Sequence, residues 1–220
     1  VVLRQHILAI GLYQLCHLSG SIYAKAHAAF QSRDAFITPG QDSNHPGNGV
    51  LGGVCGRGSD GGSSGMKRGD EGVVIAYGSM YGNTEQMAEA IAAELSAQGI
   101  KNIVMHNVSK SNPSYIIADI FKYRGLIIGS PTYSNQIYPE IESLLSKILV
   151  REVKGRYLGY FGSFCWAGAA VKRMGEFAEK SKFEIVGDPV EMKQAMKDIT
   201  YEQCENLARA MAERLKKDRK

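Results

Sequence analysis

Residues 78–84, Gly-Ser-Met-Tyr-Gly-Asn-Thr, separate an apolar run from a helical pattern and contain no lysine or arginine. Backbone N–H groups at the start of a helix attract an anion, and the hydroxyls of Ser79 and Thr84 can add hydrogen-bond donors. Gly82 permits the tight backbone that wraps around a phosphate. Neutral donors alone suit a permanently bound phosphomonoester better than a nucleoside triphosphate. The segment therefore predicts a phosphomonoester site, and the alternative interpretation is a strand–helix turn with Asn83 or Thr84 as N-cap.

Three other phosphate-handling motifs are excluded by the same part of the chain. A P-loop requires G-x-x-x-x-G-K-[ST], and this loop has no such lysine. A dinucleotide fingerprint requires G-x-G-x-x-G and an acid after the second strand, where residues 107–110 read Asn-Val-Ser-Lys. A phosphoryl-accepting receiver domain requires acids at the ends of the first and third strands, which here end in Tyr77-Gly78 and Gly129-Ser130.

A second polar loop, residues 130–139, is long enough to fold over a planar ligand. Tyr133 and Tyr138 offer rings for stacking, while Ser130, Thr132 and Asn135 offer hydrogen bonds. The alternative is an ordinary surface loop in front of a helix, and for Tyr138 that interpretation is preferred.

The third loop, residues 162–168, reads Gly-Ser-Phe-Cys-Trp-Ala-Gly and carries the only tryptophan of the chain. Core packing explains Trp166 poorly, because burial of an indole requires a large area and a partner for its N–H group. A flat aromatic ligand explains it better, and the small residues would let main-chain N–H groups approach the pyrimidine edge of a flavin. Cys165 is interpreted as a small filler, since no partner thiol or activating base is visible.

Five apolar runs alternate with five helical patterns from Val73 onwards, which predicts a doubly wound parallel sheet with helices on both faces. The predicted strands are Val73–Tyr77, Asn102–Val108, Leu126–Gly129, Tyr157–Phe161 and Phe183–Val186. The predicted helices lie around Met87–Leu95 and at Pro113–Tyr123, Pro139–Val150, Ala169–Ser181 and Tyr201–Lys217. Ligands of such sheets bind at the carboxyl ends of the strands, where all three loops fall.

The three loops in this order resemble the flavodoxin family over Val73 to about Leu215. The similarity is greatest to the C-terminal flavodoxin module of flavodiiron proteins, the A-type flavoproteins that reduce oxygen or nitric oxide. It is carried by Ser130-Pro-Thr-Tyr133, the tryptophan loop and Ala170-Val-Lys172. Quinone-reducing relatives carry an arginine where this chain has Tyr133. The resemblance implies a five-stranded sheet of order 2-1-3-4-5 and FMN as cofactor.

The resemblance also implies which residues hold FMN, with no catalytic acid or base and no metal ligand. The expected cofactor-binding residues are Ser79, Met80, Tyr81, Gly82, Asn83, Thr84, Pro131, Thr132, Tyr133, Ser134, Asn135, Gly162, Ser163, Phe164, Cys165, Trp166, Ala167 and Gly168.

Residues 1–70 differ in composition from residues 71–220, which we assign to the flavodoxin-like domain. Nine of the nineteen residues at positions 47–65 are glycine, so this stretch cannot offset its ordering entropy with buried apolar area. We interpret residues 1–70 as an irregular, flexible or artefactual segment in preference to a targeting peptide, with Met66 as a candidate start. It contains no H-x-E-x-D-H ligand set, so we expect this chain to lack the diiron centre of flavodiiron proteins.

The expected function is electron transfer from a rubredoxin-like or NAD(P)H-linked reductase to a diiron domain. The alternatives are an FMN-dependent NAD(P)H:quinone or flavin reductase, a stand-alone flavodoxin carrier and a degenerate scaffold. Stand-alone flavodoxins are strongly acidic, whereas residues 71–220 carry 20 Lys and Arg against 18 Asp and Glu, which favours a module that docks to a partner. No concentrated basic patch indicates nucleic-acid binding. The four cysteines form no CxxC pair, which predicts free thiols in the cytoplasm. The chain has no apolar run long enough to span a membrane. Homo-oligomerisation is left open.

Overall fold

A parallel β-sheet lies at the centre of the computed structural model, which describes residues 37–39 and 69–218. Its strands have the order β1-β3-β2-β4-β6-β7, and β8 also pairs in parallel with β6. The strands are β1 (Ile37–Pro39), β2 (Asp70–Tyr77), β3 (Ile103–Asn107), β4 (Tyr123–Tyr133), β6 (Tyr157–Phe164), β7 (Glu184–Ile185) and β8 (Val190–Lys193). A short strand, β5 (Gln136–Ile137), pairs antiparallel with β4.

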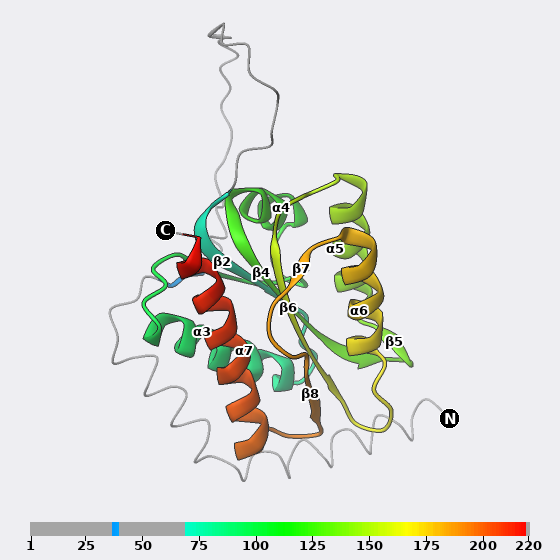
Figure 1. Cartoon of the computed structure of the whole chain (residues 1–220). Coiled ribbons are helices and arrows are strands. Elements are labelled where there is room, and N and C mark those ends of the chain that lie inside the picture. The colour runs from blue at the N-terminus through cyan, green and yellow to red at the C-terminus, as the bar shows by residue number, and fades with distance from the viewer. Residues whose placement is uncertain (1–36, 40–68, 219–220) are drawn as a thin grey trace, which may run out of the picture.

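Helices cover both faces of this sheet (Figure 1). One face carries α3 (Asn83–Ala97) and α7 (Asp198–Lys217), and the other carries α4 (Pro113–Lys122), α5 (Pro139–Val150) and α6 (Ala170–Ser181). In β2 the side chains alternate between the two hydrophobic cores, since Val73 and Ile75 pack with α3 and α7 while Val74 and Ala76 pack on the opposite face. A strand buried on both faces explains the continuous apolar run of the sequence.

The predicted fold is confirmed. The five predicted strands correspond to β2, β3, β4, β6 and β7, and their order in the sheet is the expected 2-1-3-4-5. Asn112 caps α4 as predicted, because its Oδ1 accepts from the Ser114 N–H at 2.9 Å. The N-terminal segment, expected to be irregular, contributes one short strand, since β1 pairs in parallel with β3. The rest of residues 1–68 lies outside the described residues, so the division at residue 70 stays a prediction.

The fifth predicted strand, Phe183–Val186, corresponds to β7, and a further strand, β8, follows it. Gly187 takes a φ of 72°, and Pro189 has no N–H group to donate to a neighbouring strand. The chain therefore leaves the sheet after Ile185 and returns to β6 at Val190. Strand β8 was not predicted, although its buried Val190 and Met192 alternate with exposed Glu191 and Lys193.

The predicted loop at residues 130–139 is largely a β-hairpin, because β4 continues to Tyr133 and β5 follows two residues later. Ser134 and Asn135, with φ values of 48° and 58°, make the turn. Two positive φ values are typical of the mirror-image turns that match the twist of paired strands. The segment is therefore held by strand pairing.

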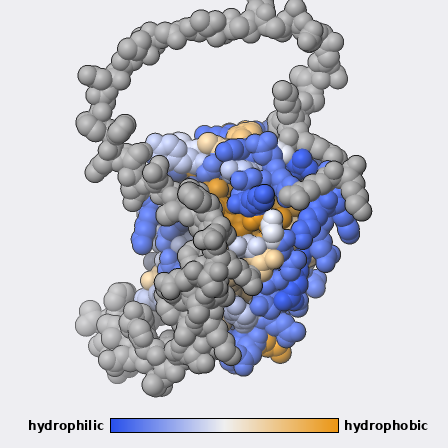
Figure 2. Space-filling model, turned by 90° about the vertical axis from the view of Figure 1, so that its left-hand side faces the viewer, coloured by the Kyte–Doolittle hydropathy of each residue, from blue (hydrophilic) through white to orange (hydrophobic). Residues whose placement is uncertain are grey.

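On the side shown in Figure 2, the visible part of the described surface is mostly hydrophilic, with a hydrophobic area near the centre and smaller ones elsewhere. Scattered apolar area of this kind is normal for a folded domain. In the described part of the chain, no helix combines the length and apolar character that a membrane span would need.

We predict that Gly129→Ala destabilises the protein by about 1–3 kcal/mol, the usual cost of overpacking a core. A Cβ atom at Gly129 would overlap the ring of Phe161, which is fully buried. Urea unfolding followed by circular dichroism measures the change. Gly175→Ala is the matched control, because the new Cβ atom would meet only the Tyr160 hydroxyl, at 3.5 Å, and helix α6 gains a better helix former. An equal loss in both variants would contradict the explanation.

Candidate functional site

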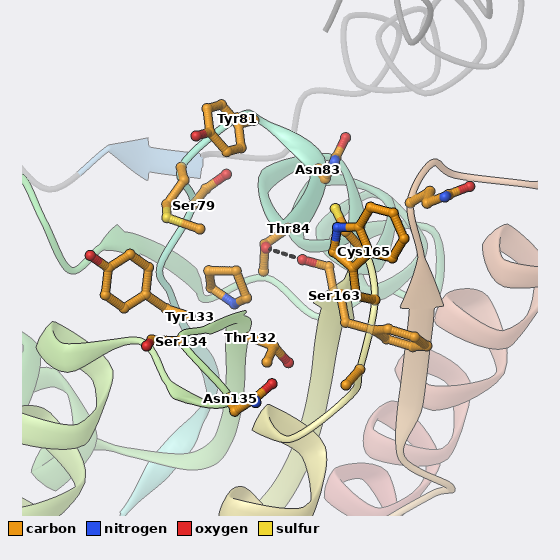
Figure 3. A pocket seen from close by; sticks show the side chains of 16 residues that line it. Ser79, Tyr81, Asn83, Thr84, Thr132, Tyr133, Ser134, Asn135, Ser163 and Cys165 are labelled. Atoms are coloured by element: carbon orange, nitrogen blue, oxygen red, sulfur yellow. Dashed lines mark hydrogen bonds between the residues drawn. The ribbon is translucent and has the colours of Figure 1, made fainter. Parts of the chain in front are cut away.

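A pocket of about 530 Å³ opens at the carboxyl ends of β2, β4 and β6. Its volume falls in the range of about 300–1,000 Å³ typical of small-molecule and cofactor sites. In Figure 3, Ser79, Tyr81 and Tyr133 lie on one side of the pocket, and Ser163 and Cys165 lie on the other. The lining residues are Ser79, Met80, Tyr81, Asn83, Thr84, Pro131, Thr132, Tyr133, Ser134, Asn135, Ser163, Phe164, Cys165, Trp166, Ala167 and Gln194.

The structure brings together all the residues of the predicted site except Gly82, Gly162 and Gly168, which do not line the pocket. Gly162 packs behind the site, where a Cβ atom would lie 2.9 Å from Val171, and a Cβ atom at Gly168 would overlap Glu191. These two glycines allow close packing behind the third loop. Whether the lining residues hold a ligand stays a prediction.

Helix α3 begins at the pocket without a side-chain cap. Its N-cap residue, Gly82, has a φ of 84° and donates its own N–H to Ser79 Oγ at 3.0 Å. The left-handed conformation favours glycine at this position. Asn83 and Thr84 in the first turn line the pocket, so the positive end of the helix lies at the cavity.

A buried pair of hydroxyl groups joins the first loop to the third. Thr84 Oγ1 and Ser163 Oγ lie 2.9 Å apart, and both residues are buried (Figure 3). Because each hydroxyl carries one proton, the group that accepts this hydrogen bond keeps its own proton for another acceptor. The pair fixes the start of α3 against the end of β6.

Thr132 lines the pocket, but its oxygen serves the protein itself. Its Oγ1 accepts from the N–H groups of Ala169 and Ala170 at 3.1 and 3.2 Å and so caps α6. Side-chain oxygens commonly satisfy the free N–H groups at a helix start.

Ser130 and Tyr138 are structural residues. Ser130 is fully buried, donates to the Pro131 carbonyl and accepts from the Tyr138 N–H, which corrects the expectation that it offers hydrogen bonds to a ligand. The Tyr138 hydroxyl lies 3.1 Å from Ser109 Oγ, and its ring packs on Gly78. Tyr138 does not line the pocket, in agreement with the preferred interpretation.

Three aromatic rings at the pocket are exposed. The exposed fractions are 56% for Tyr81, 49% for Tyr133 and 88% for Trp166. A packed interior gives no reason for so much exposed ring surface around one cavity, whereas a flat ligand would cover it.

The pocket is uncharged, since none of its lining residues is acidic or basic. Within residues 37–39 and 69–218, no group of three or more His, Cys, Asp or Glu side chains could hold a metal ion. Cys165 is exposed at the pocket and Cys204 is buried in the core, where burial raises the pKa of its thiol to about 12.

Gln194 is the lining residue that the sequence analysis missed. It follows β8, has a φ of 65°, and donates its N–H to the Phe164 carbonyl at 2.8 Å. The alternation in β8 could have located the end of the strand and therefore the position of Gln194. The left-handed backbone conformation of Gln194 could not be predicted from the sequence, because the residue at this position is not glycine.

The family model described as Flavodoxin matches residues 75–207. The chain belongs to the flavodoxin family. FMN is the cofactor of this family, and the residues of this flavodoxin-family pocket fit it. The open start of α3 and neutral donors suit a phosphate, and exposed rings suit a flavin.

Similar proteins include flavodiiron proteins. The chain is 32% identical over 144 residues to rubredoxin-oxygen oxidoreductase of Megalodesulfovibrio gigas, which covers 66% of this chain and 36% of that protein. It is 30% identical over 148 residues to putative diflavin flavoprotein A 6 of Nostoc sp., covering 67% of this chain and 26% of the relative. The flavodoxin-family domain thus spans about a quarter to a third of the length of these curated relatives.

Solved structures agree with this assignment. The metal-soaked Flv1 flavodiiron core from Synechocystis sp. PCC6803 superposes with a TM-score of 0.63 at 32% identity, covering 67% of this chain and 36% of that one. A flavodoxin from the domain Archaea has a TM-score of 0.58 at 22% identity, covering 66% of this chain and 99% of that one, and shows the shared fold.

We predict that Thr132→Val destabilises the domain by about 1–2 kcal/mol, the cost of a lost helix cap. Valine keeps the shape of threonine but leaves the N–H groups of Ala169 and Ala170 without their acceptor. Urea unfolding gives the change, and hydrogen exchange at Ala170 should accelerate. Thr132→Ser keeps the oxygen and is the control, which should stay within about 0.5 kcal/mol of the unmodified protein because its cap is intact.

Proposed function

We propose that the pocket binds FMN and that the domain transfers electrons. The observation that carries this proposal is the combination of an uncapped helix start with an uncharged pocket rimmed by exposed aromatic rings. Ser79 to Thr84 would hold the phosphate through main-chain N–H groups and hydroxyls. Tyr133 and Trp166 would cover the ring system, and Gln194 would complete the wall from the β8 side.

When bound, FMN supplies reversible one-electron and two-electron transfer. The residues of the chain bind it, orient it and exclude water from part of its surface. The Thr84–Ser163 hydroxyl pair orients the first and third loops towards one another, and the turn at Ser134 and Asn135 holds Tyr133 at the rim. No aspartate, glutamate, histidine, lysine or arginine lines the pocket, so we assign no lining side chain the role of general acid or base.

The proposed electron donor is a rubredoxin-like or NAD(P)H-linked reductase, and the proposed acceptor is a diiron centre. The names of two relatives, rubredoxin-oxygen oxidoreductase and nitric oxide reductase, support this direction of electron transfer. The diiron centre would belong to another polypeptide or to a domain beyond the described residues. We propose that the protein works in the cytoplasm.

Cofactor loading tests the proposal directly. Purified protein should be yellow, with one FMN per chain released on denaturation, and the emptied protein should quench the fluorescence of added FMN. A colourless protein that does not take up FMN would overturn the proposal. Rapid bleaching by NADH or NADPH without a reductase would instead indicate an enzyme that oxidises the nicotinamide itself.

We predict that Trp166→Ala weakens FMN binding at least about twofold, because an aromatic contact contributes about 0.5–1.5 kcal/mol beyond its buried area. The midpoint potential of the bound flavin should also shift, since the indole would contact the oxidised and reduced rings unequally. Fluorescence titration and redox titration measure the two effects. Val150→Ala is the control, because Val150 is 81% exposed at the end of α5 and does not line the pocket. Unchanged binding in Trp166→Ala would remove the indole from the site.

A further inference from the structure

Glu85 is the one acidic side chain in the first turn of α3, three residues after the N-cap Gly82. A glutamate at this position commonly folds back and accepts from the N–H group of its own N-cap residue. Here the Gly82 N–H goes to Ser79 Oγ at 3.0 Å instead. Glu85 Oε1 accepts from the Tyr77 hydroxyl at 2.8 Å. The carboxylate is therefore tied to the end of β2 and not to the start of its own helix.

Tyr77 is well placed to hold this carboxylate. It is the last residue of β2, its side chain is buried among the residues that pack with α3, and its neighbour Gly78 opens the first loop. Burial raises the pKa of its hydroxyl well above the usual range, and the hydrogen bond to Glu85 and the charges of Glu85 and Glu89 raise it further, against a lowering by Asn107. The hydroxyl keeps its proton and donates throughout the physiological pH range.

A free carboxylate at this position would act against a bound phosphate in two ways. It could satisfy the N–H groups of the first turn itself, because anions are stabilised at a helix N-terminus. It would also repel a dianion electrostatically. The second effect is the more important here, since the pocket offers no lysine or arginine to offset it.

We propose that Tyr77 is a positioning residue that holds the Glu85 carboxylate away from the start of α3, so that the pocket prefers a phosphorylated flavin to an unphosphorylated one. This inference rests on the proposed function. It assigns the discrimination between FMN and riboflavin to Tyr77, which lies outside the pocket lining and acts through Glu85.

The ratio of the dissociation constants of riboflavin and FMN tests the inference, measured by fluorescence titration of the emptied protein. In Tyr77→Phe the released carboxylate should weaken FMN binding at least fivefold and leave riboflavin binding nearly unchanged. In the double variant Tyr77→Phe with Glu85→Gln, the ratio should recover to that of Glu85→Gln alone. Raising the salt concentration should reduce the effect of Tyr77→Phe, because salt screens charge repulsion.

Tyr160→Phe is the matched control, since Tyr160 is a buried tyrosine of β6 on the opposite face of the sheet and does not line the pocket. The ratio of the riboflavin and FMN dissociation constants in Tyr160→Phe should match that of the unmodified protein. An equal loss of FMN and riboflavin binding in Tyr77→Phe, an unchanged ratio, or a loss that persists in the double variant would overturn the inference. If the unmodified protein bound neither flavin, the proposed function would fail. If it bound FMN but these variants left the ratio of the riboflavin and FMN dissociation constants unchanged, only the inference would fail.

Discussion

The parallel pairing of β2 with β4 is the constraint on which the site depends. Tyr77 stands opposite Gly129 in the register, and the Gly78 N–H donates to the Gly129 carbonyl at 2.9 Å. After these paired ends the chain turns to opposite faces, into α3 after β2 and into α5 after β4. The two loops separate because their helices lie on different sides of the sheet, and a crevice opens between them.

Hydrogen bonds within the protein support the walls of this crevice. Thr132 caps α6, Ser130 secures the hairpin, and the Thr84–Ser163 pair joins two loops. Each support satisfies polar groups that would otherwise be costly to bury. The pocket is therefore shaped by the folding requirements of its neighbours.

The fold and most of the residues that line the pocket could be predicted from the sequence, because both follow from local patterns. The apolar runs of β2 and β4 and the spacing of the helices set the order of the sheet, and the ends of the strands set the loops. The pattern could not show that Thr132 Oγ1 is used by Ala169 and Ala170, since that contact joins residues far apart in the chain. Gln194 was missed for a different reason, because a strand of four residues broken from β7 by Gly187 and Pro189 resembles a loop.

An uncharged pocket makes the position of each nearby charge more important. Where lysine or arginine binds a phosphate, a single carboxylate changes the local field only in part. A site that relies on a helix start and neutral donors has a weaker field, and one carboxylate in the first turn is comparable to it in strength. Such a site requires that the acid be held elsewhere, and the sheet supplies the means, because β2 ends in a buried tyrosine whose hydroxyl reaches Glu85. The strand that creates the crevice thereby also holds the acid of the first turn of α3.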